Sequence, residues 1–298
     1  MMMLRKFCFA AALLSLGLVS GAQAQQGVSL ASGFTDFTSW HLSGSATAAN
    51  TVQNGFSYSS LQLTTAGQGG QGGAGFAPTA LTLDFNQAFN FDFHFFISAG
   101  TVLRGDGLTF TLAGAAPTAS GIPEVGGAGS DLGYGGISNS LAFAVDTFHF
   151  DGEPVSPSLQ ILRNGSASPL AFTQTGLGDN IRDPLLQYYA TVSFTPSGNN
   201  DESGILKGSI FHPAFGTFSV SSAVDLSQLG VALDMNGDPL GHRLYYGFTA
   251  ANGLADDGHF ITSAVLVPEP STYAMLMAGV ATLVFVARRR LTQWPLGA

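Results

Sequence analysis

Residues 90–98 read NFDFHFFIS, in which large apolar side chains alternate with polar ones. In an extended chain Phe91, Phe93 and Phe95 point to one side, and the polar residues between them point to the other. This period of two predicts a β-strand with one face buried. Comparable short runs recur along the chain, each bounded by residues that favour turns. They read GLTFTLAG, SLAFAVDTF, SLQILRN, YYATVSFT, GILKGSIF, GTFSVSS, HRLYYGFTA and HFITSAVLV.

This succession of short strands, without a stretch of convincing helical period, predicts an all-β fold packed as an antiparallel sandwich or jelly roll. One glycine-rich stretch, AGQGGQGGAG at residues 66–75, formally contains G-x-G-x-x-G. A dinucleotide-binding motif needs a strand before it and a helix after it, and the sequence indicates neither. We therefore expect a flexible loop over these residues.

The two ends of the 298-residue chain have the character of targeting signals. Residues 1–24 combine a basic start, the apolar run FCFAAALLSLGLV and the small-residue sequence AQA, which predicts a secretory signal peptide. Its removal takes away Cys8, the only cysteine, so we expect no disulfide in the folded part. Residues 272–287 are uncharged and mostly apolar and precede three arginines. We expect a single transmembrane helix there, with a buried core helix as the alternative.

The middle of the chain, residues 25–266, is long enough for one large β domain. With Val267 included, it holds 18 acidic and 5 basic residues, a formal charge of −13. Such a surface repels phosphate backbones, so we do not expect nucleic acid as a partner. The middle also lacks a G-x-S-x-G elbow, an H-E-x-x-H motif and a cysteine cluster, and its histidines are scattered. Nucleophilic and zinc chemistry therefore have no support in the sequence.

The C-terminal segment VPEPSTYAMLMAGVATLVFVARRR has three parts in a fixed order: a short motif, an apolar span and an arginine cluster. It resembles the PEP-CTERM sorting signal of Gram-negative bacteria, which we place at residues 267–291. Its motif residues are Val267, Pro268, Glu269, Pro270, Arg288, Arg289 and Arg290. The resemblance implies transient insertion in the inner membrane, processing by an exosortase, and delivery to the cell surface or the exopolysaccharide matrix.

Four pieces of the middle occur in the order GDGLTFTL (105–112), LGYGGI (132–137), SLAFAVDTF (140–148) and YYGFTAANGLADDGHFITSAVL (245–266). Together they resemble the L-type, legume-like lectins. The resemblance implies a concanavalin-like antiparallel jelly roll over residues 25–266. It also implies a carbohydrate site at one end of the sandwich, for a polysaccharide or glycoconjugate.

The same resemblance assigns the site residue by residue. Asp106 looks like the sugar-binding aspartate, which in these lectins follows a cis peptide bond, although a simple turn aspartate is the alternative. A carboxylate suits this role because it accepts two hydroxyl hydrogen bonds at once. The glycines after Leu132 would offer a backbone N–H to the sugar, and residues 253–258 would form the loop that selects it. The implied site comprises Asp106, Gly133, Tyr134, Gly135, Asp256, Asp257 and Gly258.

Asp146 looks like the aspartate that bridges Ca²⁺ and a transition metal in typical members. Here the metal-binding glutamate position is Ala144 and the histidine position is Ser158, so the resemblance implies that the transition-metal site is lost. Oxygen ligands for Ca²⁺ remain at Asp146, Phe148, Asp151 and Glu153. Because Ca²⁺ takes about 6 to 8 oxygens, the alternatives are a weakened Ca²⁺ site, no metal, or a hydrogen bond that Asp146 accepts from the backbone of its own loop.

Phe150 stands where the family has an asparagine, and we expect it to fill the core rather than to stack on a sugar ring. The resemblance favours an exported carbohydrate-binding protein that is not an enzyme. A structural matrix protein that has lost binding is the alternative. A glycosidase of this fold is a weak third hypothesis, because it needs two carboxylates on one strand, and AVDTFH at residues 144–149 lacks both glutamates.

Overall fold

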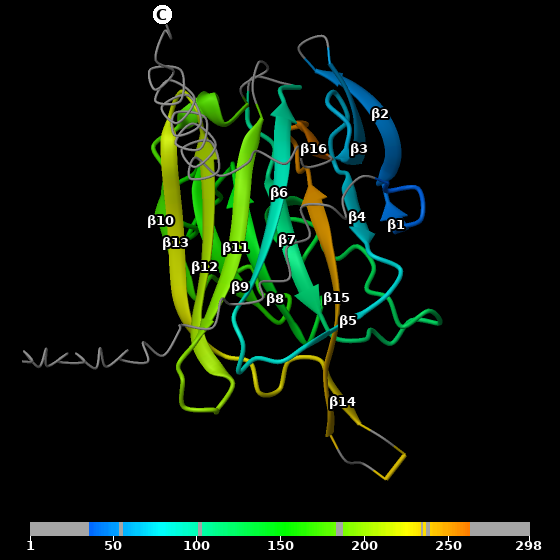
Figure 1. Ribbon diagram of the computed structural model, residues 1–298. Helices are drawn as coiled ribbons and strands as arrows, with labels where there is room; N and C mark the ends of the chain where they lie inside the picture. Colours follow the sequence, from blue (N-terminus) through cyan, green and yellow to red (C-terminus); the bar gives the residue numbers. More distant parts are fainter. Residues whose placement is uncertain are drawn as a thin grey trace, which may run out of the picture.

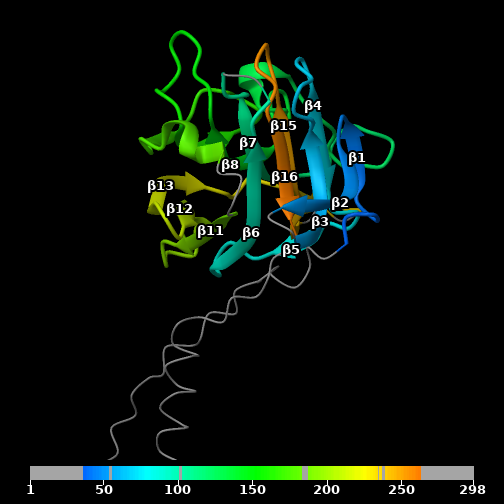
Figure 2. The same cartoon turned by 90° about the horizontal axis from the view of Figure 1, so that it is seen from above.

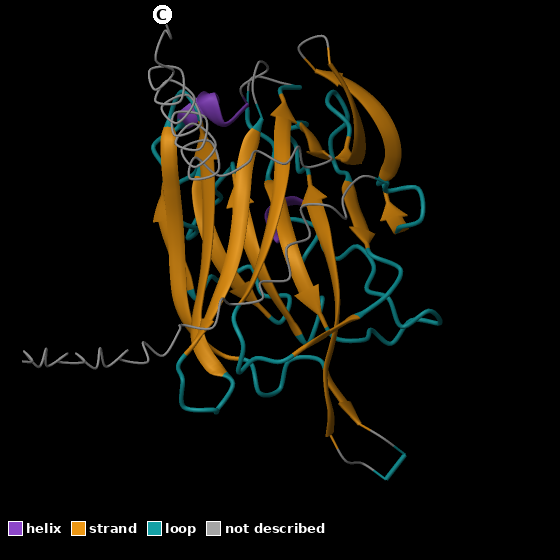
Figure 3. Cartoon of the chain, viewed as in Figure 1, coloured by secondary structure: helices purple, strands orange, loops and turns teal. Residues whose placement is uncertain are grey.

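The computed structural model describes residues 36–53, 56–100, 103–182, 187–233, 235–236 and 239–262. The expected signal peptide, residues 1–24, and the expected sorting signal with its transmembrane helix, residues 267–291, lie outside these residues. No helix in the described part of the chain is long and apolar enough to cross a membrane. Strands dominate the described part of the chain, which also contains two short helical turns, η1 (Gly129–Asp131) and η2 (Gly178–Arg182) (Figure 3).

The described strands form two antiparallel sheets that pack face to face (Figures 1 and 2). The first runs in the order β1 (His41–Gly44), β4 (Gly72–Phe76), β15 (Pro239–Ala251), β7 (Gly107–Ala113), β8 (Ser140–Asp146), β9 (Ser158–Arg163) and β10 (Ala171–Gln174), and β5 (Leu81–Leu83) and β14 (Val231–Leu233) pair with β15. The second runs in the order β13 (Gly216–Asp225), β12 (Ser203–His212), β11 (Tyr188–Pro196), β6 (Phe89–Ser98), β16 (Gly258–Thr262), β3 (Phe56–Thr64) and β2 (Thr47–Gln53). The predicted all-β, antiparallel sandwich is confirmed.

The main core lies between the two sheets and is rich in phenylalanine. Phe91, Phe93 and Phe95 of β6 are fully buried, as their alternation predicts. From the opposite sheet, the ring of Phe110 lies 4.9 Å from that of Phe91, and the ring of Phe248 lies 4.9 Å from that of Phe93. Burial of each such side chain contributes about 1.5–3 kcal/mol. Truncating one, as in Phe93→Ala, would cost about 3–5 kcal/mol because a cavity is left behind.

The first sheet is buried on its outer face as well, which explains why β8 is apolar on both sides. Residues 114–139 cross that face and cover a second apolar cluster. The cluster includes Ala142 and Ala144 of β8 together with Tyr134 from the covering segment. A strand with two covered faces carries a continuous apolar run rather than an alternating one. The stretch SLAFAVD is such a run.

The glycine-rich stretch is not wholly a loop, and this part of the prediction is wrong. Its second half belongs to β4, whose residues are nearly all buried. A side chain at Gly73 would collide with the backbone of Leu63, and one at Gly75 would lie 2.8 Å from the Leu61 side chain. Glycine in a strand marks such a close approach of another segment. The stretch is therefore glycine-rich because β4 packs closely against β3.

Three loops emerge together because of the register of β7. Gly107, the first residue of β7, pairs with Asp146 at the end of β8 and with Ala251 at the end of β15. The segments that adjoin these residues therefore lie at the same end of the strands, at the top of Figure 1. We call this region the loop end and define it as residues 99–100, 103–106, 147–157 and 252–257.

Candidate functional site

Asp106 lies at the loop end, immediately before β7. Its side chain is 4% exposed, and its Oδ2 has no hydrogen-bond partner within the described residues. The backbone N–H of Gly253 donates to the carboxyl group. Burial raises the pKa of Asp106 to about 6, and the nearby Glu153 and Asp257 carboxylates add to the rise. The site thus holds a carboxyl group with a free acceptor oxygen at the end of the sandwich.

The backbone around Asp106 differs from the expectation drawn from the resemblance. The Gly105–Asp106 peptide bond is trans, and the one cis bond in the described part of the chain joins Ser156 to Pro157. The unusual conformation of this turn lies instead at Gly107, whose φ is 132°. Only glycine adopts such an angle readily. A side chain at Gly107 would also collide with the Val145 carbonyl.

Asp257 is fully buried and ties three segments together. Its carboxylate accepts hydrogen bonds from the backbone N–H of Gly100 at 3.1 Å and of Gly105 at 2.8 Å. It also accepts one from Arg182 Nη1 at 3.2 Å. Its neighbour Asp256 is 8% exposed, with Oδ1 unpartnered among the described residues. The structure therefore places Asp257 as an anchor beneath the loop end.

Gly258 begins β16 and pairs with Ser98 of β6. A side chain there would lie 2.5 Å from the Ser98 hydroxyl oxygen, so the strand needs glycine at this position. Gly258 thus lies inside the sheet, at the base of the loop that precedes it. Gly258 therefore has a structural role, in which it lets the loop at residues 252–257 join β16 without a steric clash.

The LGYGG segment reaches the first sheet just below the loop end. Thr249 donates its hydroxyl to the Leu132 carbonyl at 2.8 Å, and Gly133 packs so closely on Ala250 that a side chain would collide. Tyr134 is fully buried, with its hydroxyl 2.7 Å from that of Ser140. The backbone N–H groups that were expected to contact a sugar instead donate hydrogen bonds within the protein. Gly133 donates to Gly127, Gly135 to Asp131 and Gly136 to Gly165.

Two arginines that contact the loop end, Arg104 within it and Arg182 of η2, were not predicted from the sequence. Arg104 donates from Nε to the Thr147 carbonyl at 2.7 Å and from Nη1 to Asp179 at 2.9 Å. Arg182 donates to the Leu103 carbonyl at 3.3 Å and to Asp179 at 2.9 Å, in addition to Asp257. Arg104 and Arg182 lower the pKa of Asp179. A signal was available, because residues 25–267 contain only five basic residues and these are two of them.

Asp146 is buried and accepts hydrogen bonds from the protein itself. Phe148 N–H and Ser156 Oγ donate to Oδ1 at 3.1 and 2.9 Å. Gln160 Nε2 donates to Oδ2 at 2.5 Å. Burial raises the pKa of Asp146 to about 7, and the Ser156 hydroxyl opposes that rise. Among the alternatives drawn from the sequence, the hydrogen bond within its own loop is the one that the structure contains.

The residues around Asp146 do not fit a metal ion. A cation needs lone pairs, and this carboxylate is instead surrounded by N–H and O–H donors. Glu153 uses Oε2 to accept the Phe150 N–H at 2.6 Å, and Asp151 is exposed on the adjoining turn. The described residues contain no group of three or more His, Cys, Asp and Glu side chains that could hold a metal. Phe148 is half-buried and contributes its N–H rather than its carbonyl to the network.

Phe150 is 67% exposed, so the prediction that it fills the core is wrong. Within its turn the Phe150 N–H donates to Glu153 Oε2 at 2.6 Å, and the ring is left facing solvent. Leu103 and Leu254, on the other two loops, are 57% and 102% exposed. The loop end therefore combines a buried carboxyl group with exposed apolar side chains.

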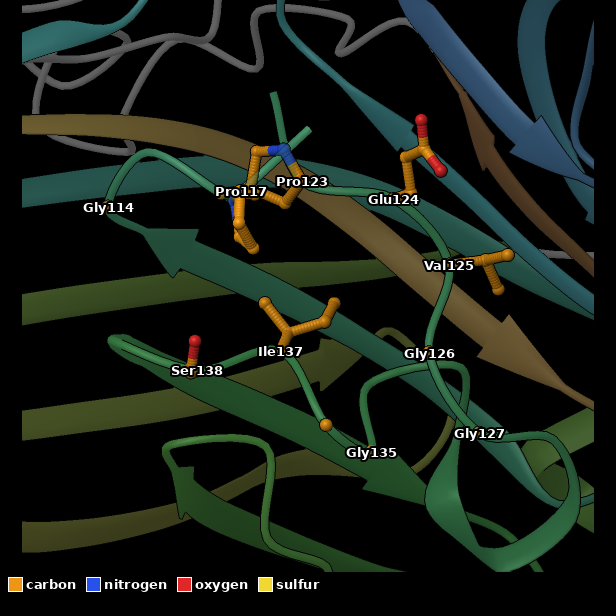
Figure 4. A pocket seen from close by; sticks show the side chains of 12 residues that line it. Gly114, Pro117, Pro123, Glu124, Val125, Gly126, Gly127, Gly135, Ile137 and Ser138 are labelled. Atoms are coloured by element: carbon orange, nitrogen blue, oxygen red, sulfur yellow. The ribbon is translucent and has the colours of Figure 1, made fainter. Parts of the chain in front are cut away.

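A separate groove of about 420 Å³ lies on the outer face of the first sheet (Figure 4). It runs from Gly114, at the edge opposite to Gly107, past Pro117 and Pro123 to the glycines near Gly126. Among the described residues that line it, Glu124 is the one with a charged side chain. The groove is distinct from the loop end, since it starts where β7 finishes.

Two parts of the chain resemble known proteins, the C-terminal segment in sequence and the described domain in fold. Residues 266–290 match the PEP-CTERM protein-sorting motif. The lectin from Bauhinia forficata in complex with GalNAc has a TM-score of 0.59 at 18% identity, over 77% of this chain and 92% of that one. Basic winged bean lectin with Tn-antigen gives 0.57 at 21%, over 77% and 93%. The metal-free form of lectin I-B4 from Griffonia simplicifolia gives 0.56 at 20%, over 75% and 90%. The predicted legume-lectin jelly roll is confirmed, as is the resemblance of the C-terminal segment to the sorting motif.

Proposed function

We propose that the protein is an exported carbohydrate-binding protein of the cell surface or the exopolysaccharide matrix. The observation that carries the proposal is Asp106, a buried carboxyl group at the loop end with one oxygen that has no partner among the described residues. It lies in a fold shared with lectins that are described in complex with GalNAc and with Tn-antigen. The ligand class is a polysaccharide or glycoconjugate.

In this proposal Asp106 contacts the sugar directly. Its ionised carboxylate accepts hydrogen bonds from ring hydroxyls, and such charge-assisted bonds are about twice as strong as neutral ones. Asp256, whose Oδ1 likewise has no partner in the described part of the chain, is the second candidate contact. The exposed Phe150 and Leu254 would lie against the apolar C–H face of a sugar ring. The other residues of the expected site support the loop end from within the protein; they are Asp257, Gly258, Gly133, Tyr134 and Gly135.

Export would follow from the PEP-CTERM motif at residues 266–290. We propose that the chain crosses the inner membrane, that an exosortase acts on it near Val267 to Pro270, and that the domain is released to the outside. The acidic middle suits a neutral or cationic glycan better than a polyanion, because like charges repel. No step of this proposal involves a metal, since the residues around Asp146 do not fit one.

The experiment is a glycan array probed with the purified protein and with Asp106→Asn. Asparagine keeps the shape of the side chain but removes the charge and one acceptor. Glu124→Gln serves as the matched control because it neutralises a carboxylate in the separate groove. The proposal predicts glycans that bind the wild type and Glu124→Gln but not Asp106→Asn.

A blank array with the wild-type protein would favour a structural matrix protein on a lectin fold. The observation on that side is the internal use of the Gly133, Gly135 and Gly136 N–H groups. A glycosidase has less support, because the matched structures are lectins and Ala144, at the glutamate position, is buried in the apolar outer cluster.

A further inference from the structure

We infer that the loop end is held in shape by the chain's own hydrogen-bond donors and two arginines, which occupy the role that bound cations would otherwise have there. The inference concerns how the loops are ordered, and it stands whether or not a glycan binds to them. Three donors surround the buried Asp146 carboxylate.

Gln160 is the residue that excludes a cation at Asp146. The register pairs Asp146 with Ser158, so Gln160, two residues further along β9, is a diagonal neighbour on the same face. Its Nε2 donates to Asp146 Oδ2 at 2.5 Å and to Ser158 Oγ at 3.0 Å. With the amide reversed, its carbonyl oxygen would face the carboxylate, which is repulsive. The amide nitrogen therefore faces Asp146, at a place where a metal would need lone pairs.

The other oxygen of Asp146 joins the two ends of the loop at residues 147–157. Phe148 N–H, at its beginning, and Ser156 Oγ, near its end, both donate to Oδ1. One buried carboxylate thus closes the loop without another ligand. Three donors to a single carboxylate leave few of its lone pairs free.

The arginines connect this loop to its neighbours. Arg104 belongs to the segment before β7 and donates to the Thr147 carbonyl, so it joins the loop at residues 103–106 to the loop at residues 147–157. Arg182, from η2, donates to the Leu103 carbonyl and to the Asp257 carboxylate, so it joins the loop at residues 103–106 to the loop at residues 252–257. Both guanidinium groups also meet at Asp179. Fixed cationic side chains therefore supply the positive charge between the acidic loops.

The test compares thermal unfolding of the purified protein in millimolar CaCl₂ and MnCl₂ with unfolding in EDTA, beside calorimetric titration of both ions. A metal present at 100 times its Kd would raise the Tm of a domain of this size by roughly 5–10 °C. We expect the Tm values in CaCl₂, in MnCl₂ and in EDTA to agree within about 1 °C. A rise of about 5 °C with Ca²⁺, or saturable metal-binding heat, overturns the inference.

Gln160→Glu provides the matched variant, since it keeps the shape of the side chain and removes the donor. The new carboxylate would face Asp146 across the strands, so we expect the Tm to fall by at least about 5 °C in EDTA. Gln174→Glu, on the exposed side of the adjacent β10, should melt like the wild type. If Gln160→Glu melts with the wild type as well, the Gln160 donor is dispensable and the inference fails. The titration of the wild-type protein decides the question even if this variant does not fold.

Discussion

Arg182 Nη1 lies 3.2 Å from Asp257 Oδ1, and both side chains are buried. Asp257 in turn receives the N–H groups of Gly100 and Gly105, so this pair joins three segments at the end of the sandwich that carries Asp106.

Arg182→Ala leaves the Asp257 carboxylate buried without its cation. Removing one partner of a buried ion pair costs about 3–5 kcal/mol. We expect a loss of that order in the free energy of unfolding, measured with urea. Arg243→Ala, at an exposed position on β15, should change the same free energy by less than about 0.5 kcal/mol. Equal effects of the two substitutions would contradict the role given to Arg182.

Phe150→Ala separates a binding role from a packing role. Because Phe150 is 67% exposed, its truncation should change stability by less than about 0.5 kcal/mol, whereas a core phenylalanine would cost about 3–5 kcal/mol. If its ring stacks on the sugar, the affinity for the best array ligand should fall roughly tenfold. Phe172→Ala, which is 52% exposed on β10, should leave both quantities unchanged.

Glycan binding should weaken in mild acid. The pKa of Asp106 is raised to about 6, so the carboxylate is ionised above that pH and takes up a proton below it. Protonation removes the charge and part of the acceptor capacity. Affinity should therefore be constant from pH 8 to 7 and then fall by up to about tenfold per pH unit below about pH 6. A flat profile down to pH 4 would show that the Asp106 charge is not used in binding.

His259 should make the fold acid-sensitive. It is fully buried, and burial lowers its pKa to about 3, while Nε2 has no partner in the described part of the chain. Thr64 donates its hydroxyl to the Asp257 carbonyl at 2.8 Å, so His259 Nδ1, 2.7 Å away, must carry the proton and donate to Thr64. The neutral ring of the native state binds fewer protons than the unfolded chain does. Its contribution is therefore complete above about pH 6.5 and is lost as the pH falls toward 3.

The measurement is the free energy of unfolding in urea at pH 7, 6, 5 and 4, for the wild type and for His259→Asn, whose amide N–H can replace the Nδ1 donor. The wild-type slope should exceed that of the variant by up to about 1.4 kcal/mol per pH unit between pH 6 and 4. Asp106 and Asp146 have raised pKa values and act in the opposite direction, but they are present in both proteins and cancel in the difference. Identical slopes would mean that His259 is not buried in its neutral form.

The sequence predicted the parts of the fold that depend on local pattern. The alternation around Phe93 and the apolar run SLAFAVDTF predicted two strands of the core, β6 and β8. Strand β4 was missed because its glycines carry no apolar signal. Their role depends on the closeness of β3, which no local pattern encodes. The burial of Phe150 was predicted wrongly because the exposure of a loop residue depends on how far the adjacent loops extend.

The candidate site shows the same division. Asp106 could be found from its motif, but Gln160 and the two arginines could not be assigned to it. Gln160 meets Asp146 only through the register of β8 with β9, and Arg104 meets Asp179 across a separation of 75 residues. Contacts of this kind depend on the tertiary fold.

The central claim is that Asp106 binds a carbohydrate. Its most direct test is the affinity of the purified protein and of Asp106→Asn for the strongest glycan found on the array, measured by titration calorimetry at pH 7.5 in EDTA. We predict saturable binding by the wild type and at least a roughly tenfold loss in Asp106→Asn, equivalent to about 1.4 kcal/mol. Failure of the wild type to bind, or equal affinities of the two proteins, would contradict the account.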